Sequence, residues 1–350
     1  MKFSFWFFCI FLLAIRFLTS APNFKNGQLL RLGGYIYSEP NVSSRGVNFN
    51  LSGIAVSLKT EIEVHYGDFV VVEGVYKDGK VIASKINEFK ESQNLLVNIR
   101  KRLLYFYKSS LPEPHASLVA GITIGAKSGL SKNFSDKLKS SGTSHVVVAS
   151  GMNITMVGQF VLSLLLIFLS RKKSLIFSLI LIWIYTAIAG FEAPIVRAVI
   201  MASIVFIGEI FGRVNNTLRY LGLSAFVMLL IVPSWIADVG FLLSFATTLS
   251  LVLFESKISR LISFVPSIIK EDLSTSIAAQ IGSAPILFYF FGSFNILSPF
   301  INTLVLWTVA PIMIIGGVSG ILSFVFPGLA RIILQLAYPL TAWFVSVILL

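Results

Sequence analysis

The pattern of apolar and polar positions changes abruptly near residue 145. Before this point, short runs rich in Val, Ile, Tyr and Phe alternate with clusters of turn-forming residues, as in the strands of a water-exposed domain. After it, roughly 200 residues are almost entirely apolar, and only short polar loops interrupt them. Since about 20 apolar residues are enough to cross a bilayer, the pattern predicts a polytopic α-helical membrane protein with a small all-β module.

Composition agrees with this division. The mean hydropathy is +0.84 and 55% of the residues are hydrophobic, more than is typical of a soluble domain. The single cysteine, Cys9, excludes a disulfide framework within one chain. The formal net charge of +12 has two interpretations: Lys and Arg gather in the cytoplasmic loops of inner-membrane proteins, or the partner is a polyanion.

The apolar region divides into segments separated by loops of alternating charge. The segments lie at about 145–170, 174–190, 194–212, 218–234, 239–255, 275–291, 296–322 and 332–350. One set of loops is basic and contains Arg171, Lys172, Lys173, Arg213, Arg219, Lys257, Arg260, Lys270 and Arg331, whereas the loops around 190–194, 234–238 and 291–296 contain neither Lys nor Arg. The positive-inside rule places the basic set in the cytoplasm and the β module outside. Residues 258–274 are expected to form an interfacial cytoplasmic helix rather than a span.

The first 20 residues contain a shorter apolar run, from Phe3 to Leu18, which Arg16 interrupts. Two interpretations remain open. The run is either a signal peptide that is cleaved after the small residues near Ala21, or an uncleaved transmembrane anchor. Pro22 makes the cleavage site less suitable and favours the anchor.

Residues 22–92 are expected to form an extracytoplasmic β module. Lys77-Asp78-Gly79-Lys80 joins two alternating runs and predicts a hairpin. Four or five strands in such a short stretch suit a small barrel of the oligonucleotide/oligosaccharide-binding (OB) type, which can stack bases on aromatic side chains along a basic groove. Candidate contacts are Tyr35, Tyr37, Phe49, Tyr66, Phe69 and Tyr76 for the bases, and Lys59, Lys77, Lys80 and Lys85 for the phosphates. The structural alternative is that half of these aromatic residues fill the barrel and the lysines are solvated edge charges.

Residues 93–144 connect the module to the apolar region. Asn94 to Lys108 has the pattern of an amphipathic helix with Arg100, Lys101 and Arg102, and its expected place is the membrane interface or the flank of the bundle. The remainder is expected to be a packed connector.

Several polar residues lie at the starts of apolar segments: His145, Arg197, Asp238 and Asn302. A charge at the bilayer centre costs about 2.5–3.5 kcal/mol on insertion scales, so such residues receive a functional interpretation. In the predicted topology all four begin spans that enter from outside, and they are expected to form a polar mouth there. Two structural alternatives stay open: snorkelling to the interface, and an Arg197–Asp238 ion pair that holds two helices together.

Four motifs in this region resemble the signature of the ComEC/Rec2 competence family. AGITIGAKSGLSKNFSDKLKSSGTSHVVVASGMNI contains His145, Ser150, Gly151 and Asn153; it is followed by APIVRAVIMA around Arg197, DVGFLLSFATTLSL around Asp238, and SIAAQIGSAPILFYFFGSFNILSPFINTLVLWTVAPI around Gln280 and Asn302. The motifs follow the order of the family over residues 116–315. The module at 29–89 is similar in pattern to the OB-type domain of that family.

The resemblance implies a channel component that carries single-stranded DNA across the bacterial cytoplasmic membrane during natural transformation. It implies single-stranded DNA and the lipid bilayer as partners, together with a separate DNA receptor, nuclease and cytoplasmic ATPase. The DNA path or polar mouth would then comprise His145, Ser150, Gly151, Asn153, Arg197, Asp238, Gln280 and Asn302.

The chain departs from the family pattern in several ways. Asn153 stands where full-length members often have a second His, and many members have more spans before the module and a metallo-β-lactamase-like domain at the end. Here there is no HxHxDH pattern, and the spacings of the three histidines do not suit a zinc nuclease. There is also no GxxxxGK[ST] motif. We therefore expect no catalytic residue, metal or cofactor in this chain. It ends within an apolar run, as a truncated bundle would.

Two other functions compete with DNA uptake. One is small-solute transport or a structural role in an envelope assembly, although no inverted repeat of the secondary-transporter type is evident. The other is intramembrane hydrolysis by His145, Ser150 and Asp238. His145 and Ser150 are five residues apart, so on one helix they point in different directions, which disfavours the hydrolase.

Overall fold

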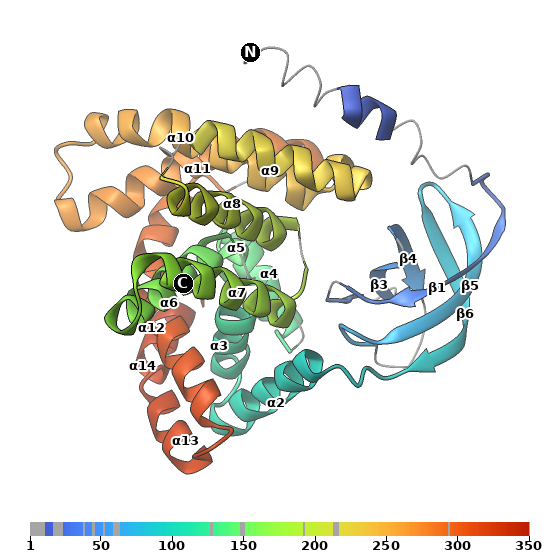
Figure 1. Ribbon diagram of the computed structural model, residues 1–350, viewed down its shortest axis with the longest axis horizontal. Coiled ribbons are helices and arrows are strands. Elements are labelled where there is room, and N and C mark those ends of the chain that lie inside the picture. Colours follow the sequence, from blue (N-terminus) through green and yellow to red (C-terminus); the bar gives the residue numbers. More distant parts are fainter. Residues whose placement is uncertain are drawn as a thin grey trace.

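The computed structural model describes residues 11–16, 24–37, 39–43, 46–51, 53–58, 64–126, 129–147, 151–191, 193–212, 217–292 and 295–349, and the side chains of these except at 41–43, 145, 193, 268 and 291. Figure 1 shows two parts, a β module and a larger helical bundle, and helix α2 runs from one to the other. Both predicted parts, the all-β module and the apolar α-helical bundle, are therefore confirmed.

The β module is one mixed sheet. Its strands are β1 (Leu29–Tyr35), β2 (Asn41–Ser43), β3 (Gly46–Leu51), β4 (Ile54–Leu58), β5 (Phe69–Lys77) and β6 (Lys80–Lys90), in the order β1-β5-β6-β4-β3-β2. Among these described strands, β4 and β6 pair in parallel and the other neighbours pair antiparallel. The consecutive strands β1 and β2 lie at opposite ends of this order, and β1 also contacts β3, so the sheet curls around its core.

The predicted hairpin at residues 77–80 is confirmed. Lys77 pairs with Lys80, and Asp78 and Gly79 both have positive φ angles, 50° and 82°. A two-residue turn with positive φ at both positions matches the right-handed twist of the flanking strands. The alternating positions beside this turn supply the buried face: Val70, Val72 and Val81 are fully buried in the core of the module.

The bundle contains helices of very different lengths. Its elements are α2 (Leu95–Ser110), α3 (His115–Ile124), α4 (Lys132–Ser140), α5 (Ser144–Val147), α6 (Gly151–Phe168), α7 (Arg171–Ala189), α8 (Ala193–Ile210), α9 (Thr217–Ile231), η1 (Pro233–Ala237), α10 (Val239–Leu261), α11 (Ser267–Phe291), α12 (Ser298–Leu322), α13 (Pro327–Gln335) and α14 (Tyr338–Leu349). Within the described residues, five helices are long and apolar enough to cross a membrane, or six if the bent pair α13–α14 is one span. The chain is thus a multi-pass membrane protein.

Two features of the bundle differ from the sequence predictions. Of the eight predicted apolar segments, those at 194–212 and 218–234 are not among the described spans; α9 has only 15 residues, and α14, with 12, can form a span only together with α13. The predicted interfacial helix at 258–274 is wrong: α10 continues to Leu261, and α11 begins at Ser267 after a short turn. Lys257 and Arg260 therefore lie near the end of α10, and Lys270 lies near the start of α11.

Arg331, which the charge pattern assigns to the side opposite the module, lies on α13 and shares a pocket with Lys101 and Arg102 of α2, the helix that leaves the module.

Close approach of helices depends on glycine at several contacts. On α11, a Cβ built on Gly282 would lie 2.5 Å from the carbonyl oxygen of Ala246 and 2.7 Å from Cβ of Ser250, both on α10. Ser250 also donates a hydrogen bond to the carbonyl of Ala278 at 2.6 Å. Small residues at such contacts let helix backbones pack closely in membranes.

Gly282→Ala is therefore expected to destabilise the α10–α11 pair by about 1–3 kcal/mol, because the backbone of Ala246 must shift. Thermal unfolding of the detergent-solubilised chain measures the effect. Gly317→Ala is the matched control, since a Cβ there meets nothing within 4 Å and alanine favours the helix. Equal unfolding temperatures for the two variants would contradict the prediction.

Candidate functional site

Arg197 lies one turn into α8, and its side chain is held between α8 and α10. The residue is only 9% exposed. Its Nε donates to Oγ of Ser244, its Nη1 donates to Sδ of Met201 at 3.2 Å, and its Cζ lies 5.8 Å from the ring centroid of Phe245. A hydroxyl, a thioether and an aromatic face thus surround the guanidinium.

Gly151 completes this arrangement. It is the first residue of α6, and a Cβ built on it would lie 2.7 Å from Nη2 of Arg197. Any side chain at this position would displace the guanidinium. The group formed by Gly151, Arg197 and Ser244, called the Arg197 site below, therefore joins three helices, α6, α8 and α10.

Asp238 does not pair with Arg197. Its Oδ1 accepts a hydrogen bond from the backbone N–H of Phe241 at 2.8 Å and caps the start of α10, which satisfies a free donor at the helix end. Among the described residues Arg197 forms no ion pair with any carboxylate. The alternative of an Arg197–Asp238 pair is thus wrong, and the two helices are held through Ser244.

Asn153 is fully buried near the start of α6. Its Nδ2 donates to the carbonyl oxygen of Ile122 on α3 at 2.9 Å. This bond fixes the start of α6 against the last turn of α3. The backbone of His145 lies in α5, but its side chain and the whole of Ser150 lie outside the described residues.

Gln280 and Asn302 belong to a second polar group. Nε2 of Gln280 donates to the carbonyl of Asn295 at 2.7 Å, and Nδ2 of Asn302 donates to Oγ of Ser298 at 3.2 Å. The remaining amide oxygens, Oε1 of Gln280 and Oδ1 of Asn302, are buried and accept no hydrogen bond from the described residues. Such unpaired acceptors are rare in folded proteins, and an ordered water or a bound group can satisfy them.

The contacts among the described residues link the predicted mouth residues into two groups, and the single polar mouth stays a prediction. The Arg197 site and Asp238 gather at the starts of α6, α8 and α10, whereas the second group lies where α12 begins, beside the α4–α5 turn at Gly142. Sequence reasoning missed Ser244, Phe245 and Met201. Ser244 and Phe245 lie in the same motif as Asp238, two turns into α10, which is the signal that could have found them. Within the described ranges, no three His, Cys, Asp or Glu side chains come together as metal ligands would.

In the β module, Tyr35, Tyr37 and Phe69 form an aromatic edge. Tyr35 and Tyr37 are 52% and 61% exposed. The ring centroid of Tyr35 lies 6.4 Å from that of Tyr37 and 5.2 Å from that of Phe69. The carbonyl oxygen of Tyr37 accepts a hydrogen bond from the backbone N–H of Phe191, between α7 and α8, at 3.3 Å. The aromatic edge thus adjoins the loop that leads into α8 and Arg197.

The other predicted aromatic residues, Tyr66, Tyr76 and Phe49, make contacts within the protein. Tyr66 donates its hydroxyl to the carbonyl of Ala187 on α7 at 2.8 Å, and the guanidinium of Arg100 covers its ring at 5.7 Å. Burial raises the pKa of Tyr66, so the hydroxyl stays a neutral donor. Tyr76 packs on Phe24, with centroids 5.6 Å apart, and Phe49 is buried in the core. Phe49 and Tyr76 pack in the core of the module, as the structural alternative expects, whereas Tyr66 contacts the bundle, which neither interpretation predicts.

The lysines do not form a continuous basic groove. Lys77 and Lys80 are exposed at the hairpin tip, and Lys85 is exposed along β6, where Glu73 of β5 is its cross-strand neighbour. Lys59 lies outside the described residues. Any contact between the described lysines and a polyanion would therefore occur at separate points.

Arg100 joins the module to the bundle. It is 4% exposed, forms an ion pair with Glu39 of the module, and donates to the carbonyls of Ile124 on α3 and Ile188 on α7. The amphipathic pattern of 94–108 predicted a helix at the membrane interface or the flank of the bundle and gave no sign that Arg100 is buried. The missed signal is its position on α2, where it shares the buried face with Val97, Leu103 and Tyr107.

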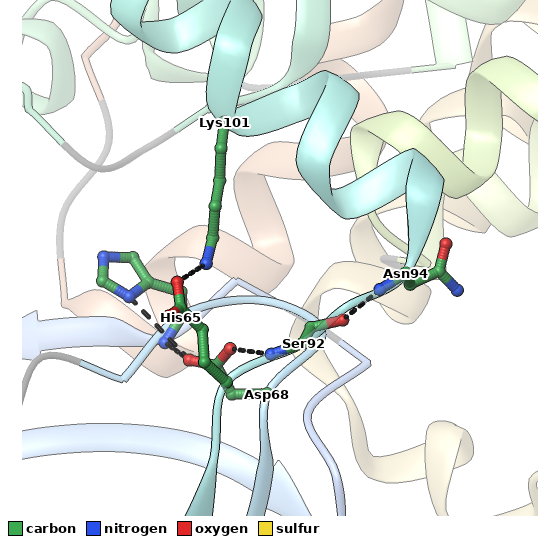
Figure 2. Close-up of polar contacts among 6 residues, drawn as sticks. His65, Asp68, Ser92, Asn94 and Lys101 are labelled. Atoms are coloured by element: carbon green, nitrogen blue, oxygen red, sulfur yellow. Dashed lines mark hydrogen bonds and ion pairs between the residues drawn. The ribbon is translucent and has the colours of Figure 1, made fainter.

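A second contact fixes the direction in which α2 leaves the module, and Figure 2 shows it. The buried carboxylate of Asp68 accepts from the backbone N–H groups of His65, at 2.9 Å, and Ser92, at 3.0 Å. Oγ of Ser92 in turn accepts from the N–H of Asn94, the residue that caps α2. About two turns further along α2, Lys101 forms an ion pair with Glu91. The module is thus attached to α2 through a chain of hydrogen bonds rather than a free linker.

The comparisons with known proteins fall mainly on the bundle. Residues 122–350 match the family model described as Competence protein. The chain is 27% identical over 244 residues to ComE operon protein 3 of Bacillus subtilis (strain 168), and this alignment covers 68% of the chain. It covers 31% of that relative, so the chain spans about a third of the relative's length. No solved structure matches the chain.

Proposed function

Because this chain belongs to the competence protein family, we propose that it is a membrane component for the uptake of single-stranded DNA across the cytoplasmic membrane. In this proposal the β module faces outward and receives the strand, and the bundle provides the path. Separate proteins act as the DNA receptor, nuclease and cytoplasmic ATPase, and we assign no catalytic step to this chain.

The observation that carries the proposal is the contact between Tyr37 and Phe191. It puts the exposed rings of the aromatic edge beside the loop that leads into α8, one turn before Arg197, which is buried and forms no ion pair with the described carboxylates. Aromatic rings bind bases without sequence preference, and a guanidinium binds phosphate through charge-assisted hydrogen bonds. A strand that leaves the rings thus meets a cation next.

The site also favours release. Arg197 makes its described contacts with neutral groups, and the lysines of the module are dispersed. Transport of a polyanion needs binding that is favourable enough for entry and weak enough for exit. A few separated cations meet that condition better than a continuous basic groove would. In a deletion strain, uptake of labelled DNA should be lost and should return when the deleted gene is restored.

Tyr35→Ala/Tyr37→Ala is expected to weaken binding of a single-stranded oligonucleotide by the full chain about tenfold or more, because base–aromatic stacking contributes about 1–3 kcal/mol per base. The dependence of affinity on salt should stay nearly unchanged, since no cation is removed. Fluorescence anisotropy in detergent across a salt series measures both quantities.

Lys77→Ala/Lys80→Ala is the contrasting variant in that series. If these lysines contact phosphates, the salt dependence should become shallower while stacking persists. Unchanged binding in the tyrosine variant would remove the aromatic edge from the proposal. Salt-independent binding by the wild type would remove phosphate contact altogether.

The outward position of the module is tested by topology reporters. A reporter fused after Lys173 should be cytoplasmic, and one fused after Gly190 should be external, because Lys and Arg are absent from the loop that follows α7. Gly190 lies two residues after Ile188, whose carbonyl accepts a hydrogen bond from Arg100, and Arg100 pairs with Glu39 of the module. The reporter after Gly190 therefore also reports the side of the membrane on which the module lies. A cytoplasmic signal after Gly190 would place the module inside and contradict the proposal.

A further inference from the structure

A basic pocket lies between α2 and the α12–α13 turn, away from the Arg197 site. Its volume is about 450 Å³, and its cations are Lys101 and Arg102 of α2 and Arg331 of α13. Ser109 and Ser323 bring hydroxyl groups to its wall. The two helices are held together at their far ends by a hydrogen bond from Nε2 of Gln335 to the carbonyl of Ser110, at 2.9 Å.

The positive charge of this pocket is only partly balanced. Lys101 forms an ion pair with Glu91. Arg102 and Arg331 are exposed, and neither forms an ion pair within the part of the chain that the structure describes. Two guanidinium groups that converge on one pocket without a carboxylate favour an anionic ligand, and their planar donors suit phosphate in particular.

The surroundings of the pocket are apolar and exposed. Tyr105 is 75% exposed and Phe324 44%, and both line the pocket. The exposed surface continues through Val325, Phe326, Leu329 and Ile332. In a multi-pass membrane protein, such a surface is covered by lipid chains. In a ligand that carries both a phosphate and hydrocarbon, the phosphate would pair with the guanidinium groups and the hydrocarbon would cover the apolar surface. The phosphates of a nucleic acid would leave the apolar surface uncovered.

We propose that this pocket binds the headgroup of an anionic phospholipid, with its phosphate between Arg102 and Arg331 and its acyl chains along the exposed side chains of α13. Basic pockets between membrane helices bind anionic headgroups in this way. The bound lipid would link α2 to α13 and so connect the helix that supports the module to the end of the bundle.

Native mass spectrometry of the full chain in detergent tests this proposal. The probes are phosphatidylglycerol and phosphatidylcholine with identical acyl chains. The wild type should retain phosphatidylglycerol preferentially, and Arg102→Gln/Arg331→Gln should weaken retention about thirtyfold, since each basic residue near the surface strengthens binding to anionic lipid about fivefold. Lys172→Gln/Lys173→Gln removes two exposed charges at the start of α7 and should keep the preference.

Several results would overturn the proposal. Equal retention of both lipids by the wild type would exclude headgroup recognition. Equal losses in the two double variants would show attraction to overall charge rather than to the pocket. Displacement of the lipid by inorganic phosphate at the same concentration would indicate a free-anion site, and displacement by a thymidine oligonucleotide would indicate a nucleic-acid site.

Discussion

Replacing Arg100 with methionine should destabilise the joint between the β module and the bundle by about 3–5 kcal/mol. Removing one partner of a buried ion pair leaves the other charge uncompensated, and here Glu39 would remain with its side chain 7% exposed. The carbonyls of Ile124 and Ile188 would also lose their donor. Thermal unfolding in detergent measures the stability, and limited proteolysis between residues 90 and 95 measures the release of the module.

Two variants separate this effect from a general loss of charge. Lys108→Met changes an exposed cation of the same helix and should alter stability by no more than about 0.5 kcal/mol. Arg100→Met/Glu39→Leu removes both charges and should recover part of the loss, because no carboxylate is stranded. If Arg100→Met unfolds at the same temperature as Lys108→Met, the joint does not depend on this pair.

The sequence was sufficient for features that depend on local pattern. The Asp78-Gly79 turn is specified by two residues that tolerate positive φ. The long apolar helices follow from hydrophobic runs that need no particular partner. The start of α2 was predictable for the same reason, since Asn94 caps the helix through its own neighbour Leu96.

The parts that could not be predicted depend on partners far apart in the chain. Arg100 contacts Glu39 and Ile188, which lie 61 and 88 residues away, and no periodicity reports such pairs. The aromatic residues of the module illustrate the same limit: Tyr35 and Tyr66 have equal propensity for strand and surface, but only the packing of α7 decides that Tyr66 is covered. The contacts of Arg197 show the same limit, because it donates to Ser244, 47 residues away in the chain.

Arg197→Ala is expected to reduce the uptake of labelled DNA by roughly ten- to hundredfold while the protein still inserts. A hydrogen bond to a charged group contributes about 1.5–3 kcal/mol, and the guanidinium is the cation that a strand meets after the aromatic edge in the proposed path. Arg197→Lys should recover part of the uptake, because the charge remains and the planar fork is lost. Internalised DNA and the abundance of the protein in membranes should be measured in the same cells.

Arg171→Ala is the matched control, since it also removes one arginine from the bundle but from the exposed start of α7; it should leave uptake unchanged. Arg197→Ala/Asp238→Ala adds a second test. Because Arg197 and Asp238 do not pair in the structure and Asp238 caps α10, the double variant should be less abundant than Arg197→Ala, and uptake should not return. Recovery of both abundance and uptake in the double variant would mean that the two residues form an ion pair in the membrane. Loss of uptake only in proportion to abundance would give Arg197 a structural role through Ser244 and would remove it from the DNA path.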